Sequence, residues 1–283
     1  MQISKVFNNN VVAIDANGQE QVVMGRGIAF QKRPGDPIDQ TRIEKIFTLE
    51  SKESYERFVH FLNEMPTDEM ETVKQIVRLA EERLKQPIHD SLYVTLADHL
   101  HFALSRYQDG IQIRNPLVWE VKRFYAPEFA VGKEAVKLIN AQHEVNLDED
   151  EAVAIALHLV NATMSGVKGE NLHLVTEMTR ATQAILTIIT YHFQIELDEE
   201  SYAYARFLTH LKYFVQRLAS GEKVKSTGDE TLFLMVKQRY PEAFECVEKI
   251  AGLIATKYHY DVSMDERLYM MIHIENLMKE RRS

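Results

Sequence analysis

The sequence predicts a multidomain chain: a small N-terminal all-β domain with a four-stranded antiparallel sheet, followed by two homologous all-α helical-bundle domains. Three observations predict this class. The 283 residues, at about 150 residues per domain, suggest more than one folding unit. Strand-like segments separated by turn residues fill the first fifty positions, and helical periodicity fills the remainder. The helical part also aligns with itself, which indicates an internal repeat.

Four short segments in the first fifty residues predict the antiparallel sheet. They are rich in Val, Ile and Phe, and glycine, proline or asparagine bounds them. Asn17-Gly18 stands between the second and third, and this pair supplies the positive φ angles of a type I′ hairpin turn. A sheet this small is marginal alone, so we expect it to pair with a second copy of itself. The predicted strands are Ile3–Phe7, Val11–Asp15, Gln21–Met24 and Ile43–Leu49.

From about residue 54 the apolar residues recur at helical spacing, and the helical part divides into two copies. Tyr93–Arg106 aligns without gaps on Tyr204–Arg217, and Leu147–Ala162 aligns on Val262–Leu277. A glycine-bearing stretch at residues 165–171 lies between the copies. We therefore predict three domains, with boundaries at residues 1–56, 57–169 and 170–283.

Composition limits the class of protein. Hydrophobic residues make up 45% of the chain and charged residues 27%, the balance of an ordinary globular protein. The net charge of -9 argues against a generic basic nucleic-acid binder. Residues 1–50, however, hold six basic and six acidic side chains, so the net acidity resides in the helical part. The neutral β domain is compatible with RNA recognition by shape and stacking rather than by a broad basic patch.

The chain has the features of a cytoplasmic protein. Cys246 is its only cysteine, so neither an intrachain disulfide nor a cysteine-based metal cluster can form. The N-terminus lacks the pattern of a signal peptide, and no apolar run is long enough to span a bilayer. We expect a cytoplasmic location without membrane insertion.

Four of the eleven histidines occupy matching positions in the two copies. A lone helical histidine is more often structural or exposed, and a metal site is a weak alternative because His99 and His101 do not face each other on a helix. A duplicated pair instead favours a phosphorylation switch, since imidazole accepts a phosphoryl group and the dianionic product changes local electrostatics. Arg106 and Arg217 follow two turns later and are candidate partners. The four histidines are His99, His158, His210 and His273.

The β domain carries side chains suited to unpaired RNA. Asparagine amides can read base edges, arginine and phenylalanine planes can stack on bases, and glycine lets RNA approach the backbone. For Phe30, a place in the hydrophobic core is an equal alternative. The candidate RNA-binding residues are Lys5, Asn8, Asn10, Gly25, Arg26, Gly27 and Phe30.

No enzyme motif competes with these interpretations. The glycine-rich stretch Met24–Gly27 lacks the lysine and the strand–loop–helix context of a phosphate-binding loop. The sequence has neither a Gly-x-Ser-x-Gly elbow nor a His-Glu-x-x-His motif. We therefore predict no catalytic site, no metal site and no cofactor.

These motifs together resemble the BglG/LicT/SacY family of bacterial transcriptional antiterminators, from the first residue to the last few. The resemblance is strongest to members that serve β-glucoside operons. It rests on NNNV at Asn8–Val11, VVMGRGIAFQK at Val22–Lys32, SLYVTLADHLHFA at Ser91–Ala103, ALHLVNA at Ala156–Ala162, THLKYF at Thr209–Phe214 and IHIE at Ile272–Glu275.

The resemblance implies an RNA-binding function under sugar control. A homodimer of the N-terminal domain would bind the ribonucleic antiterminator hairpin in a leader mRNA and prevent a terminator from forming. The helical copies would be phosphotransferase-system regulation domains, phosphorylated on the four paired histidines by enzyme II and HPr. Thr209 replaces Asp98 beside the first histidine, which fits unequal roles of the two copies. The alternative is a DNA-binding activator with the same regulation domains, which would need a helix-turn-helix.

Overall fold

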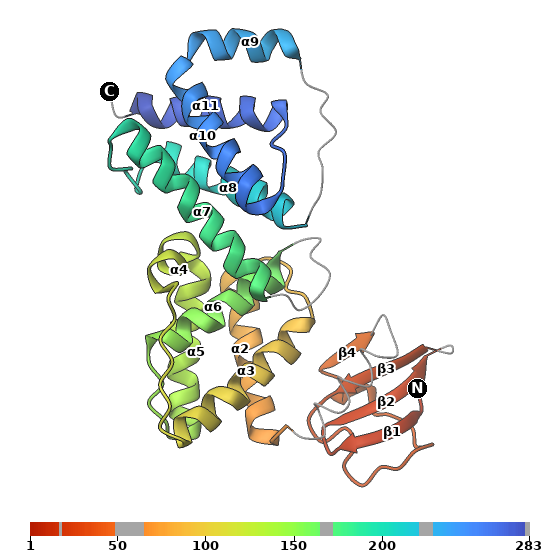
Figure 1. The fold of residues 1–283 in the computed structure, drawn as a ribbon. Helices are drawn as coiled ribbons and strands as arrows, with labels where there is room; N and C mark the ends of the chain where they lie inside the picture. Colours follow the sequence, from red (N-terminus) through yellow and green to blue (C-terminus); the bar gives the residue numbers. More distant parts are fainter. Residues whose placement is uncertain (17–18, 49–64, 165–171, 221–228, 281–283) are drawn as a thin grey trace. The chain divides into compact units, whose positions relative to one another are not determined.

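The computed structural model describes residues 1–16, 19–48, 65–164, 172–220 and 229–280 (Figure 1). It confirms an N-terminal antiparallel sheet followed by helices. The sheet order is β1-β2-β3-β4, so each strand pairs with its neighbour in sequence. The Asn17-Gly18 turn lies outside the described residues. The strands are β1 (Ile3–Asn8), β2 (Val11–Ala16), β3 (Gln19–Met24) and β4 (Lys45–Thr48).

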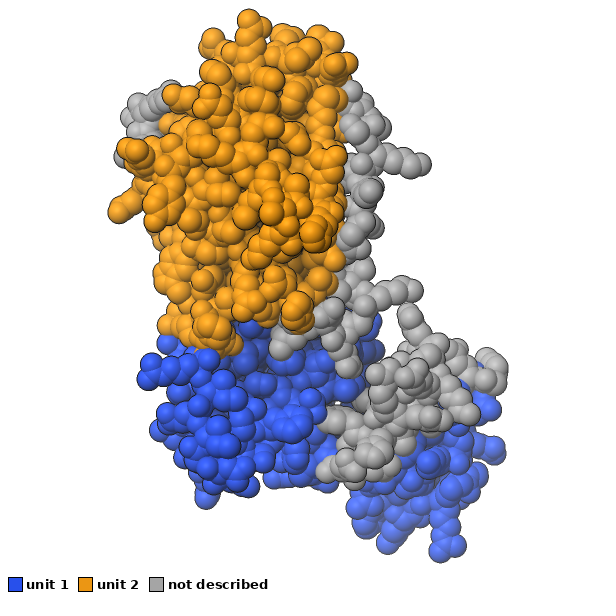
Figure 2. All heavy atoms as spheres, in the orientation of Figure 1, with its two compact units in different colours: residues 1–114, 130–163 blue, residues 115–129, 164–283 orange. Residues whose placement is uncertain are grey.

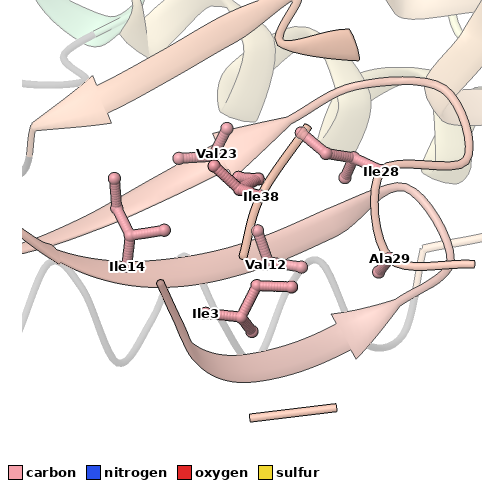
Figure 3. Close-up of a cluster of buried hydrophobic side chains, with 7 residues drawn as sticks. All are labelled: Ile3, Val12, Ile14, Val23, Ile28, Ala29 and Ile38. Atoms are coloured by element: carbon pink, nitrogen blue, oxygen red, sulfur yellow. The ribbon is translucent and has the colours of Figure 1, made fainter. Parts of the chain in front are cut away.

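One face of the sheet is closed by the chain that connects β3 to β4. The strands pair Val12 with Val23, and both side chains are fully buried. Ile28, Ala29 and Ile38, from the connection, pack on this face of the sheet. Figure 3 shows the cluster, which is formed by Ile3, Val12, Ile14, Val23, Ile28, Ala29 and Ile38. Burying these apolar side chains holds the connection against the sheet and so fixes the loop that begins it.

The described helices confirm the internal repeat, because they form two series in the same order. Asp148 directly precedes the last helix of the first series, and its carboxylate accepts a hydrogen bond from the Asp150 amide, as expected of a residue that caps a helix start. The first series is α2 (Thr67–Leu84), α3 (Ser91–Gln108), α4 (Val118–Phe124), α5 (Ala126–His143) and α6 (Glu149–Thr163). The second is α7 (Leu172–Phe193), α8 (Tyr202–Ser220), α9 (Glu230–Arg239), α10 (Pro241–Tyr258) and α11 (Met264–Glu280).

The chain divides into two compact units whose boundary differs from that of the repeat (Figure 2). One unit holds residues 1–114 and 130–163, and the other holds residues 115–129 and 164–283. Helix α4 therefore belongs with the second unit, where it packs on α7. Arg123 of α4 fixes this position, because its Nε donates to the Tyr204 hydroxyl at 2.9 Å and pairs with Glu199.

The predicted domain boundaries after residues 56 and 169 lie outside the described residues and stay predictions. None of the described helices combines the length and apolar content that crossing a bilayer requires.

Candidate functional site

The first pair of matching histidines meets where α3 and α6 pack together. His99 on α3 and His158 on α6 have ring centroids 5.1 Å apart. His158 is buried within an almost continuously buried stretch of α6. Burial, together with the neighbouring His99 ring, lowers the pKa of His158 to about 3. The His158 ring is therefore neutral at physiological pH.

Glu151, in the first turn of α6, connects this histidine pair to an arginine. Its Oε1 accepts a hydrogen bond from Nη2 of Arg106 at 2.9 Å, and its Oε2 lies 2.9 Å from Nε2 of His99. The second contact is electrostatic, because its geometry is not that of a directed hydrogen bond. Burial alone would raise the pKa of the Glu151 carboxyl, but His99 and Arg106 outweigh burial and hold that pKa below its usual value. An ionised carboxylate thus links α6 to two side chains of α3.

The second pair has similar ring geometry but a different partner. His210 on α8 and His273 on α11 have ring centroids 4.7 Å apart. The Tyr269 hydroxyl lies 2.7 Å from Nδ1 of His210, and the Tyr269 ring lies 4.4 Å from that of His273. Burial, with the nearby His210 and Arg206, lowers the pKa of His273 to about 4. In the alignment of the copies, Tyr269 replaces Ala154.

Glu266, the counterpart of Glu151, is held elsewhere. Its carboxylate accepts hydrogen bonds from the Tyr260 hydroxyl at 3.1 Å and from the Ser263 hydroxyl at 3.0 Å, and Arg217 lies 3.5 Å away. The first copy has Val145 and Asp148 at the positions of Tyr260 and Ser263, so it has no hydroxyl donors there. This difference explains why the carboxylate reaches the histidine in one copy only.

The sequence predicted the histidines and arginines of these two sites but not three side chains that contact them, Glu151, Glu266 and Tyr269. Arg106 and Arg217 do lie at these sites, where each meets a glutamate of the last helix in its copy. The matching Glu151 and Glu266 were visible in the alignment, where they indicate only a helix start. Tyr269 carried no signal, because the first copy has no equivalent side chain.

The candidate RNA-binding residues of the β domain gather at one turn and one loop. The Asn10 side-chain oxygen accepts a hydrogen bond from the Gly27 amide at 2.8 Å, and the Asn8 side-chain oxygen accepts one from the Asn10 amide at 2.9 Å. Gly27 has a positive φ of 64°, which favours glycine. A Cβ on Gly25 would lie 1.8 Å from the Arg42 carbonyl oxygen. The sequence at these positions therefore shapes a fixed loop.

The same loop presents two side chains to solvent. Phe30 is 59% exposed, so the alternative that places it in the hydrophobic core is wrong. Arg26 is exposed as well. Lys5 is also exposed, but it stands on β1 with its ammonium 5.3 Å from the centre of the Phe7 ring. The structure therefore brings Asn8, Asn10 and the loop residues together and leaves Lys5 farther back along β1.

Within the part of the chain that the structure describes, no three His, Cys, Asp or Glu side chains converge as metal ligands. Each described site instead joins two helices through a histidine pair, and in the first copy a carboxylate and an arginine lie beside that pair.

Two family models match the chain. The model described as CAT RNA binding domain matches residues 1–56, and the PRD domain model matches residues 74–162 and 183–277. These matches cover the sheet and both helical copies.

Relatives match along the full length. Transcription antiterminator LicT of Bacillus subtilis (strain 168) is 46% identical over 281 residues, which is 99% of this chain and 100% of the relative. A beta-glucoside operon antiterminator of Dickeya chrysanthemi is 44% identical over 281 residues, or 99% and 98% of the two chains. The crystal structure of GlcT CAT-PRDI has a TM-score of 0.52 and 28% identity, and covers 58% of this chain and 98% of that one.

Proposed function

Because the chain belongs to the family of transcription antiterminators that join a CAT RNA binding domain to PRD domains, we propose that it controls a β-glucoside operon. It is a non-enzymatic RNA-binding antiterminator with two PRD regulatory domains. In the proposed mechanism, a homodimer binds a hairpin in the leader mRNA, prevents the terminator from forming, and does so in the cytoplasm. Phosphorylation of the paired histidines sets its activity.

The loop from Gly25 to Phe30 is the observation that supports RNA binding most directly. The side chain of Asn10 accepts a hydrogen bond from the backbone of this loop, while Arg26 and Phe30 are exposed on the loop. A fixed loop offers planar groups to unpaired bases at little cost in conformational entropy. The described part of this domain is a β-sheet with its connections and contains no helix-turn-helix, which the DNA-binding alternative would need.

Replacing Phe30 by Ala tests this surface. We expect the affinity of the full chain for leader hairpin RNA to fall by roughly 10- to 100-fold, since base–aromatic stacking contributes about 1–3 kcal/mol per base. Thermal unfolding should stay unchanged, because the Phe30 ring is mostly outside the core. The measurement is a gel shift against the hairpin and against duplex DNA of matched sequence.

Phe102 provides a matched control for this experiment. It lies on α3 and is 53% exposed, so Phe102→Ala removes a similar ring from the helical part. The control should bind RNA as the unchanged chain does. Equal affinity for RNA and DNA, or no binding to either, would refute the proposed RNA target.

Histidine phosphorylation is the proposed control, with enzyme II and HPr of the phosphotransferase system as donors. The support is the pairing of two histidine rings at each of the contacts α3–α6 and α8–α11, with Glu151 and Arg106 beside the first pair. A phosphate at His99 would repel Glu151 and attract Arg106. Shifting a switch from mostly off to mostly on takes about 5 kcal/mol of differential stabilisation, which charges at partly buried helix contacts can supply.

Phosphorylation can be tested with purified donors. The full chain, incubated with HPr and enzyme II, should acquire acid-labile phosphate. That phosphate should be absent when all four histidines (His99, His158, His210 and His273) are replaced by Gln. Acid-labile phosphate that persists in the replaced chain would exclude these sites.

A further inference from the structure

We propose that the two PRD copies accept phosphate on different ring nitrogens, His99 on Nδ1 and His210 on Nε2. The inference rests on the proposed function, since it takes phosphorylation of these histidines as its premise. It follows from the side-chain oxygen that adjoins each ring. In the first copy this oxygen is the Glu151 carboxylate, and in the second it is the Tyr269 hydroxyl.

The carboxylate in the first copy fixes the tautomer of His99. Oε2 of Glu151 lies 2.9 Å from Nε2, and an ionised carboxylate has only lone pairs to offer. A proton on Nε2 replaces repulsion between lone pairs with attraction. Arg106 binds the other oxygen of the same carboxylate, which keeps it ionised and in place. The unshared lone pair of the neutral ring therefore lies on Nδ1.

Accessibility points to the same nitrogen of His99. The side chain is 15% exposed, and Nε2 is buried against the carboxylate. Nδ1 is not among the buried unpartnered atoms, and no hydrogen-bond partner lies on it within the described residues. Nδ1 is therefore the ring nitrogen of His99 that keeps some exposure to solvent.

The second copy reverses this arrangement. The Tyr269 hydroxyl, 2.7 Å from Nδ1, occupies the position that a phosphorus atom would need. Burial raises the pKa of Tyr269, so the hydroxyl stays neutral, and its oxygen can accept a hydrogen bond from a protonated Nδ1. Glu266 is held by Tyr260 and Ser263 and makes no contact with the ring. Among the described residues no side chain is bonded to Nε2 of His210, which makes it the nitrogen open to a phosphoryl donor.

The transfer itself balances without a further reactant. The lone pair of Nδ1 of His99 attacks the phosphorus of a phosphohistidine carrier, and the carrier's N–P bond breaks with its electron pair returning to the carrier nitrogen. Nε2 of His99 keeps its proton. The positive charge of the protonated phosphoimidazole thereby moves from the carrier ring to the His99 ring, next to the Glu151 carboxylate. Glu151 is a positioning residue, because it acts through His99.

The experiment identifies the phosphohistidine isomer at each site. The full chain is phosphorylated with HPr and enzyme II and digested under alkaline conditions, and the peptides that carry His99 and His210 are separated. The isomer in each peptide is compared with synthetic Nδ1- and Nε2-phosphohistidine. We expect at least about a tenfold excess of the Nδ1 isomer at His99, as a charge-assisted contact allows, and the reverse excess at His210.

Three variants separate positioning from general structural effects. Glu151→Gln should lower the excess of the Nδ1 isomer at His99, because an amide can face either tautomer. Glu266→Gln is its matched control and should leave the ratio at His210 unchanged. Tyr269→Phe keeps the ring contact with His273 but removes the hydroxyl, so the Nδ1 isomer should appear at His210.

The same isomer at both sites, or a ratio at His99 that Glu151→Gln does not move, would overturn the inference. Phosphate found only in the peptides of His158 and His273 would overturn it as well, whereas absence of phosphate from the peptides of all four histidines would refute the proposed function. Long-range ¹⁵N–¹H correlation spectra of the unphosphorylated chain test the inference independently. They should show His99 with its proton on Nε2, and a proton on Nδ1 would contradict the proposal even if Glu151→Gln fails to fold.

Discussion

The buried His158 ring should make the stability of the first PRD copy depend on pH. The pKa of this ring is about 3 in the folded chain, against an ordinary value of 6.5. The unfolded chain therefore binds a proton more readily than the folded chain. The stability that the neutral ring contributes is complete above about pH 6.5, and it is lost progressively as the pH falls toward 3.

The size of the effect follows from the two pKa values. A pH of about 5 is about 1.5 units below the pKa of the ring in the unfolded chain, so that ring is mostly protonated, while the ring in the folded chain is still almost fully neutral. At about 1.4 kcal/mol per unit, the proton stabilises the unfolded chain by about 2 kcal/mol. Carboxylates add their own pH dependence, so the contribution of His158 has to be isolated by substitution.

Urea unfolding followed by circular dichroism at about pH 7.5 and about pH 5 measures this contribution. His158→Gln removes the titrating ring, so the variant should lose about 2 kcal/mol less stability between the two pH values than the unchanged chain. His89→Gln, at an exposed site of the same unit, is the matched control and should follow the unchanged chain. If the unchanged chain and His158→Gln lose the same stability between the two pH values, the folded site accepts a proton as readily as the unfolded chain, and the prediction is wrong.

Two further predictions follow from close packing. Gly132→Ala should destabilise the chain by more than about 1 kcal/mol, because a Cβ there would lie 2.3 Å from the Ala152 carbonyl oxygen. Gly252→Ala is the matched variant: its Cβ meets open space, so it should stabilise its helix by roughly 0.5–1 kcal/mol. The urea midpoints of the two variants measure both effects. Cys246 is fully buried, and burial raises the pKa of its thiol to about 12, so iodoacetamide should label it only as fast as the chain unfolds. Rapid labelling of the folded chain, with unfolded chain as the reference, would contradict that burial.

The architecture could be predicted from the sequence because its signals are local or repeated. Turn residues lie on either side of each of the four strands, and the observed strand ends differ from the predicted ones by two residues at most. The repeat identified the histidine pairs without any knowledge of packing, since matching positions on matching helices come together in both copies. Helix α4 departs from the repeat, because Arg123 binds Tyr204 and Glu199 of the second unit. That contact depends on tertiary structure and has no periodic signal.

The partners of the histidines could not be predicted, because they depend on directions of side chains rather than on spacing. Glu151 and Glu266 are identical in the alignment, yet only Glu151 meets a histidine. The cause is the hydroxyl groups of Tyr260 and Ser263, which lie in the loop before α11 and have no counterpart in the first copy. The alignment of the two copies shows only that a glutamate is present in each, and it does not show which donors compete for the carboxylate.

This competition gives one fold two electrostatic responses. In the first copy the carboxylate that joins α6 to α3 also touches His99, so a phosphate there acts directly on the Glu151–Arg106 ion pair. In the second copy Tyr260 and Ser263 hold Glu266 away from His210, so a phosphate there leaves the corresponding pair with Arg217 in place. Charge repulsion falls with distance, so only the first modification opposes the contact that holds its two helices together. The proposed switch therefore needs no difference between the histidines themselves, because the loop before the last helix of each copy determines what a phosphate disrupts.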